Sequence, residues 1–138
     1  MASRALLPPV ALGLVFAGGA LGTLARYGVS LALPGAGWPW ATFAVNVVGA
    51  FLLGFLLELL SVHRPDNPER REVRWFFGPG FLGGFTTYST LAFEEASRTD
   101  LGTALLYGAA SLVLGVLAAL AGIRVAASMR RRRPDEAR

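Results

Sequence analysis

Charged residues divide this chain into long apolar stretches separated by short polar segments. The charges gather in residues 64–74, 94–100 and 124–138, and the sequence between these segments is nearly free of them. Over the whole chain 54% of the residues are hydrophobic and 16% are charged, whereas a soluble domain carries about 25% charged residues. Such an uneven distribution is typical of membrane-spanning helices joined by short loops in water.

Four apolar stretches are long enough to cross a bilayer. We expect spans at about residues 6–33, 38–62, 74–96 and 101–128, with a basic tail over 129–138. Each exceeds the roughly 20 residues that a helix needs to cross about 30 Å of hydrocarbon, and backbone groups in lipid must be paired inside the protein. The sequence therefore predicts an all-α membrane protein with four transmembrane helices in a single unit, residues 1–138. A cleaved signal peptide is the alternative for the first stretch, but signals have an apolar core of only about 7–15 residues.

The basic residues predict an orientation. All 13 are arginines, and all but two of them fall on one side of the predicted spans. Arg98 alone lies on the other side, and Arg26 lies within the first span. Because positive charge stays on the cytoplasmic side, we expect a multi-pass protein of the inner (plasma) membrane with both termini in the cytoplasm. Placed at span ends, these arginines indicate membrane anchoring rather than nucleic-acid binding.

The third stretch holds an unusual run of helix-disrupting residues. Four glycines and a proline occur between Gly78 and Gly84, and hydroxyl residues follow at once. Such a run makes a poor helix, and unpaired backbone groups in a bilayer cost several kcal/mol each. We therefore predict a third helix broken near its middle, around residues 83–86, whose freed backbone groups meet an ion, water or another chain. The alternative is close packing that simply needs small residues.

Two kinds of ion suit such a break. Exposed carbonyl oxygens bind a hard cation such as Na⁺, whereas N–H and hydroxyl donors bind a small anion. No acidic residue lies between Trp75 and Phe93, so side-chain carboxylates of this segment do not hold a cation.

Polar residues in the other spans are further candidates. Asn46 lies amid apolar residues of the second span, where it either faces a pore or forms an interhelical hydrogen bond. Arg26 follows Gly18 and Gly22, which form a G-x-x-x-G packing motif, and it needs carbonyls, an anion or interfacial water unless it snorkels to the span end. In the fourth span, Gly108, Gly115 and Gly122 predict a packing stripe, and Tyr107 and Ser111 offer hydroxyl donors. The sequence contains no catalytic constellation, so we do not expect an enzyme.

Three motifs together resemble the Fluc (CrcB) family of fluoride-specific ion channels. They are GGALGTLARY at residues 18–27, TFAVNVVGAFLLG at 42–54 and GGFTTYSTL at 83–91, in the family's order, and the resemblance covers about residues 10–125. It implies passive export of fluoride from the cytoplasm by an antiparallel, dual-topology-type dimer with two pores. It also implies a structural, non-transported Na⁺ at the dimer centre, held by the backbone carbonyls of Gly83 and Thr86. Matched by motif position, Asn46 is the pore asparagine and Glu94 an acidic residue that follows the third motif.

We expect the fluoride pathway to be lined mainly by hydroxyl and amide groups, with Arg26 and Glu94 in structural or electrostatic roles. The candidate pore residues are Asn46, Thr87, Tyr88, Ser89, Thr90, Leu91, Tyr107 and Ser111. Tyr88 and Leu91 stand where the family has two pore-lining phenylalanines, whose ring edges carry partial positive charge. Tyr88 keeps a ring and adds a hydroxyl, whereas Leu91 removes the second ring.

The second subunit is either this same chain in antiparallel orientation or a homologous subunit of opposite topology. The strong arginine bias favours the latter, because a chain that inserts both ways needs balanced charge. Two other functions stay open from the residues alone. A small four-helix multidrug-type transporter would need an intramembrane carboxylate, which the first span lacks, and a non-conducting membrane scaffold would show no ion flux.

Overall fold

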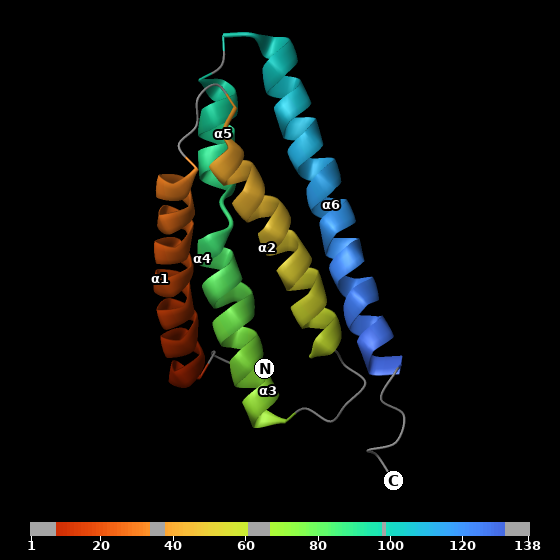
Figure 1. Cartoon of the computed structure of the whole chain (residues 1–138). Coiled ribbons are helices and arrows are strands. Elements are labelled where there is room, and N and C mark those ends of the chain that lie inside the picture. The colour runs from red at the N-terminus through yellow and green to blue at the C-terminus, as the bar shows by residue number, and fades with distance from the viewer. Residues whose placement is uncertain (1–7, 34–37, 61–66, 98, 132–138) are drawn as a thin grey trace, which may run out of the picture.

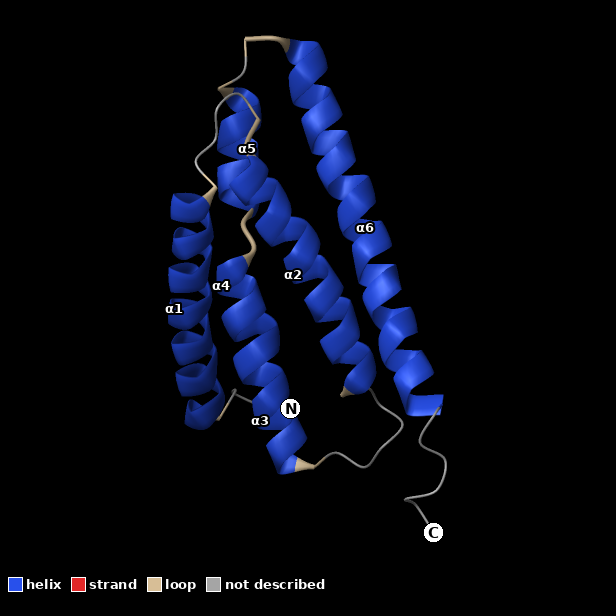
Figure 2. Ribbon diagram, in the orientation of Figure 1, coloured by secondary structure: helices blue, strands red, loops and turns tan. Residues whose placement is uncertain are grey.

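The computed structural model describes residues 8–33, 38–60, 67–97 and 99–131. Its helices are α1 (Pro9–Ala32), α2 (Trp40–Leu59), α3 (Pro68–Trp75), the π-helix η1 (Phe76–Leu82), α4 (Gly83–Phe85), α5 (Tyr88–Ala96) and α6 (Leu101–Arg131). Within these residues the chain consists of helices and short connections (Figure 2). The predicted loop position of Arg98 and the end of the basic tail, residues 132–138, fall outside the described residues.

Four helical passes run in alternating directions (Figure 1). Three of them are single helices long and apolar enough to cross a membrane, namely α1, α2 and α6. The remaining pass is assembled from α3, η1, α4 and α5 in succession. The all-helical fold with a discontinuous third pass agrees with the sequence prediction. The start of α1, the end of α2, the start of α3 and the end of α6 lie together at one end of the molecule (Figure 1).

The third pass is interrupted at two threonines rather than at its glycines. Thr86 (φ −78°, ψ 161°) and Thr87 (φ −151°, ψ 121°) are extended, and α5 begins directly after them. The preceding Gly-Pro-Gly segment stays helical as the wider η1, and Gly83–Phe85 adds one more turn. The break expected around residues 83–86 therefore begins only at the last of these residues.

The glycines of this region serve close packing of α1 against the third pass. A Cβ added at Gly18 would overlap the backbone of Phe76 and Phe81, and one at Gly22 would overlap the backbone of Phe81. The G-x-x-x-G interpretation of α1 is thus confirmed. In the third pass the packing alternative holds for Gly80 and Gly84, which contact Gly18 and Gly19, but not for Gly78 and Gly83. Small residues allow such backbone contact, which gives membrane helices their dispersion energy.

Glycines also join α2 to α6, which run in the same direction (Figure 1). A Cβ at Gly122 would overlap the backbone of Phe51, and one at Gly54 would overlap the backbone of Ala119. Gly108 contacts the carboxylate of Glu95 instead, and Gly115 borders open space. The packing stripe predicted in the fourth span is therefore a contact with α2 only at Gly122.

Side-chain contacts fix the ends of α6. Asp100 accepts hydrogen bonds from the backbone N–H groups of Thr103 (2.8 Å) and Gly102 (3.3 Å). The Thr103 hydroxyl also donates to Asp100, and these bonds hold the pKa of this exposed carboxyl below its ordinary value. At the other end, Arg130 pairs with Glu58 at the end of α2 at 3.1 Å.

We predict that Gly22→Ala destabilises the fold by about 1–3 kcal/mol, the usual cost of overpacking, because its methyl group meets the backbone of Phe81. Gly28→Ala is the matched control in the same helix, since a Cβ there has nothing within 4 Å. The thermal unfolding midpoint of the two purified variants measures the difference. Equal midpoints would contradict the close α1–η1 contact.

Candidate functional site

The side chain of Asn46 holds the break in the third pass. Its Nδ2 donates to the carbonyl of Thr87 (3.0 Å), and its Oδ1 accepts from the N–H of Thr87 (2.8 Å). The amide thus satisfies both backbone groups of Thr87, the residue directly before α5. Asn46 does form the interhelical hydrogen bond considered from the sequence, and it still has one N–H left to donate, because a primary amide carries two.

The break leaves backbone carbonyls without their helical partners. In a continuous helix the N–H of Thr87 would bind the carbonyl of Gly83, but here it binds Asn46. The N–H of Thr90 would bind the carbonyl of Thr86, but it binds the hydroxyl of Thr87 at 3.2 Å. Among the described residues, the carbonyls of Gly83 and Thr86 have no hydrogen-bond partner. Gly83 and Thr86 line a cavity of about 370 Å³ together with Asn46 and Gly49.

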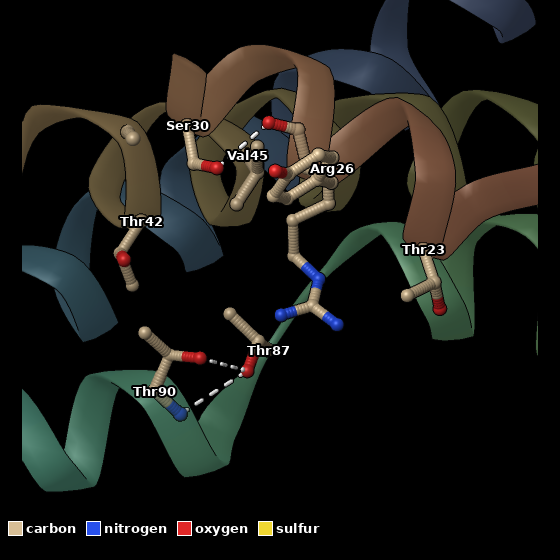
Figure 3. A pocket seen from close by; sticks show the side chains of 9 residues that line it. Thr23, Arg26, Ser30, Thr42, Val45, Thr87 and Thr90 are labelled. Carbon is tan, nitrogen blue, oxygen red and sulfur yellow. Dashed lines mark hydrogen bonds between the residues drawn. The ribbon is translucent and has the colours of Figure 1, made fainter. Parts of the chain in front are cut away.

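Arg26 satisfies a third freed carbonyl. Its Nε donates to the carbonyl oxygen of Gly84 at 3.2 Å, across 58 residues of sequence. The side chain is half-buried and turns inward toward the start of α5 (Figure 3). Its guanidinium has no carboxylate partner among the described residues, so the site around it carries uncompensated positive charge.

This arginine lines a cavity of about 250 Å³. The cavity lies between α1, α2 and α5 and is lined by Thr23, Arg26, Tyr27, Ser30, Ala41, Thr42, Val45, Thr87 and Thr90 (Figure 3). The hydroxyl of Thr87 contacts the hydroxyls of Thr90 (3.0 Å) and Ser89 (3.3 Å). Hydroxyl donors beside an unpaired guanidinium form an environment that favours a small anion.

Glu94 lies beyond this cavity, toward the α1–α2 and α5–α6 connections. Its carboxylate accepts hydrogen bonds from the hydroxyls of Thr42 (2.7 Å) and Tyr107 (2.9 Å). It lines a second cavity of about 520 Å³. Thr42, Ser30 and Thr90 line both cavities, so the two lie next to each other along α5.

The remaining candidate residues lie on the opposite side of α5. A groove of about 1020 Å³ runs between α2, α5 and α6, and Asn46, Tyr88, Leu91 and Ser111 are among the residues that line it. Tyr88 is 82% exposed, whereas Ser111 is 6% exposed and its hydroxyl has no hydrogen-bond partner among the described residues. In a single chain the predicted pore residues therefore form two separate surfaces, one on each side of α5.

Three contributors were missing from the sequence candidates. Thr42 binds Glu94, Ser30 lines both cavities, and the carbonyl of Gly84 binds Arg26. The first two had a periodicity signal, since Thr42 precedes Asn46 by one helical turn and Ser30 follows Arg26 by one turn. The role of the Gly84 carbonyl had no local signal.

Comparisons with known proteins identify the family. A family described as "CrcB-like protein, Camphor Resistance (CrcB)" matches residues 13–123. The "Fluoride-specific ion channel FluC 2" of Leifsonia xyli subsp. xyli is 48% identical over 124 residues, 87% of this chain and 86% of that protein. The "Fluoride-specific ion channel FluC 1" of Cutibacterium acnes is 51% identical over 112 residues, 80% and 78% of the two chains. The chain belongs to the CrcB/FluC family of fluoride-specific ion channels.

A third relative from the FluC family is similar to this chain over most of its length. The "Fluoride-specific ion channel FluC" of Caulobacter vibrioides is 45% identical over 119 residues, 82% of this chain and 92% of that protein. The resemblance drawn from the three sequence motifs is thus confirmed. FluC membership makes this a channel-family membrane protein rather than an enzyme.

We predict that Thr42→Val and Tyr107→Phe each lower the free energy of unfolding by about 1.5–3 kcal/mol, because each removes a hydrogen bond to the Glu94 carboxylate. The double variant should cost less than the sum, since both donors serve one acceptor group. A double-mutant cycle on thermal or denaturant unfolding measures the coupling. Ser97→Ala, which removes a hydroxyl that binds only its own helix, is the control. Strict additivity would show that the two donors do not share Glu94.

Proposed function

We propose that this chain is one subunit of a passive, fluoride-selective channel that exports fluoride from the cytoplasm and so lowers its toxicity. The observation that carries the proposal is the pairing of Asn46 with both backbone groups of Thr87. That pairing interrupts a transmembrane pass and exposes ion-binding backbone groups beside hydroxyl donors and an arginine without a carboxylate partner. The names and high identities of the FluC relatives support the same conclusion.

Fluoride is small and strongly hydrated, so a pore for it must replace lost water with donors while apolar walls exclude larger anions. Asn46, Tyr88 and Ser111 line the same groove. Asn46 has a second N–H to donate, and the hydroxyl of Ser111 has no hydrogen-bond partner among the described residues. Thr87, Ser89 and Thr90 add hydroxyls near α5's start. The positive charge of Arg26 raises the local anion concentration at the break.

The driving force needs no coupling to another ion or to ATP. A membrane potential that is negative inside pushes an anion outward by about 2.3 kcal/mol per charge per 100 mV. This chain therefore has only to help form a pathway for the ion.

The carbonyls of Gly83 and Thr86 fit a structural Na⁺. Both have lost their helical N–H partners, and both residues line one cavity at the break. Backbone carbonyls of unwound membrane helices are suitable ligands for this hard cation. Two oxygens are too few to surround it, so a second subunit would supply the rest. A bound Na⁺ would neutralise the facing carbonyl dipoles and join the two broken helices.

The open groove between α2, α5 and α6 supports a dimer, because it leaves proposed pore residues at the surface of a single chain. We infer an antiparallel partner, either a second copy or a homologous subunit of opposite topology. The arginine bias favours the homologue, with this chain's termini in the cytoplasm. Leu91 lines the groove without an aromatic edge, so a partner with two phenylalanines at the positions of Tyr88 and Leu91 would complete the pore lining.

We predict that Asn46→Leu lowers fluoride efflux roughly tenfold or more, because it removes the donor and the clamp on Thr87. Fluoride-electrode recordings of efflux from proteoliposomes measure the loss, in whichever assembly conducts. Val48→Leu on an exposed face of the same helix is the matched control. Unchanged efflux from Asn46→Leu would exclude a role for this amide in conduction.

We predict that the chain alone conducts little fluoride and that co-expression with a homologous subunit of opposite charge bias restores efflux. The physical reason is the strong arginine bias, which opposes insertion of a second, inverted copy. Efflux from liposomes made with either subunit, or with both, tests this. Robust efflux from the lone chain would favour the homodimer and leave the channel function itself intact.

A further inference from the structure

The two signs of charge are segregated on α3, the helix that leads into the broken pass. At 100° per residue, Arg70, Arg71 and Arg74 lie on one side of the helix together with Trp75, whereas Glu69 and Glu72 lie on the other. Asn67 caps the helix by accepting from the N–H of Glu69 at 2.9 Å. The helix continues directly into η1, which packs on α1 through Gly18. The basic face is therefore held in a fixed position.

The depth of α3 in the membrane follows from the sequence at its end. The polar helix changes to the apolar sequence of η1 at Phe76, and Trp75 precedes that change. Tryptophan is enriched at the level of lipid headgroups. Arg70 precedes Trp75 by five residues, or about 7.5 Å of helix, and the headgroup layer adds about 5–7 Å on each side of the hydrocarbon core. The three arginines thus lie at the depth of lipid phosphates.

Two arginines of this face, Arg70 and Arg74, are not neutralised by any residue that the structure describes. Arg70 and Arg74 are half-buried and have no hydrogen bond or ion pair with any described residue. The guanidinium of Arg71 lies over the ring of Trp75, 5.1 Å from its centroid. By contrast, Arg130 at the same end of the molecule pairs with Glu58. Arg70 and Arg74, one helical turn apart, can bind a single phosphate group from two sides.

We propose that the basic face of α3 is a binding site for the headgroup of an anionic phospholipid. Arg70 and Arg74 bind the lipid phosphate, and Trp75, with Arg71 stacked on it, packs against the glycerol and upper acyl region. The occupant is a lipid rather than a soluble phosphate, because the site combines phosphate-binding groups with an aromatic ring at the hydrocarbon boundary. This inference concerns the surface of α3 and is independent of the proposed conduction.

Lipid retention by the purified full-length chain tests the site. The protein is incubated in detergent with equal amounts of phosphatidylglycerol and phosphatidylcholine, and native mass spectrometry counts the bound lipids. We expect preferential retention of phosphatidylglycerol, and we expect Arg70→Gln/Arg74→Gln to weaken it roughly thirtyfold, from two lost surface arginines. Arg70→Lys/Arg74→Lys should retain an intermediate affinity, because lysine keeps the charge but not the planar fork.

The control variant is Arg124→Gln/Arg131→Gln, which removes two exposed arginines of α6 and leaves α3 intact. It should retain phosphatidylglycerol nearly as well as the unmodified chain. If the two glutamine variants lose phosphatidylglycerol equally, the retention depends on general surface charge and the proposed site is wrong. The absence of any preference for phosphatidylglycerol would also contradict the proposal. Displacement of the lipid by inorganic phosphate, beyond that caused by sodium chloride of equal ionic strength, would reassign the site to a soluble anion. If the glutamine variant of α3 does not fold, the lysine variant decides the same question.

Discussion

The two hydrogen bonds between the Asn46 amide and the Thr87 backbone are the interaction on which the rest of the structure depends. A helix that stops inside a bilayer must satisfy the backbone groups it frees, since lipid supplies no partners. Asn46 satisfies one residue completely, and the Thr87 hydroxyl caps the N–H of Thr90 as α5 begins. Among the described residues, the carbonyl oxygens of Gly83, Phe85 and Thr86 remain without a hydrogen-bond partner, and carbonyl oxygens of this kind can bind a cation. The same clamp ties the break to α2, and α2 is in turn packed along α6 through Gly54 and Gly122.

Close packing and interruption are separate requirements that the third pass meets with different residues. The sequence predicted a broken helix correctly, but attributed the break to the glycine-rich run, because helix propensity is a local quantity. In the structure two of those glycines, Gly80 and Gly84, let α1 approach within backbone contact, and a wider helix accommodates Pro79. The break falls at Thr86 and Thr87 because a side chain 41 residues earlier competes for the Thr87 N–H. Sequence alone showed that Asn46 was an intramembrane amide, but not which residue it would bind.

The polar residues lie on two sides of α5. This explains why the sequence could predict a set of pathway residues but not their arrangement in space. Tyr88 and Leu91, three residues apart, share the groove with Ser111, whereas Thr87 and Thr90 turn toward Arg26. Helical periodicity separates these two groups once the start of α5 is known. In the proposed dimer, the surface that carries fluoride is set by where the second subunit closes the groove, and a single sequence holds no information on that contact. Glu94, bound by Thr42 and Tyr107, lies between the two surfaces and links α2, α5 and α6.

The charge distribution connects the lipid surface to the choice of partner. If α3 holds anionic headgroups through Arg70 and Arg74, each chain gains stability from placing this end in the leaflet richer in anionic lipid. In bacteria and eukaryotes alike the potential and the positive-inside bias act in the same direction on these arginines. An inverted copy would lose both contributions, whereas an inverted homologue without the basic face of α3 would lose neither. The features that fix the orientation of this subunit therefore also favour a partner that differs from it at α3.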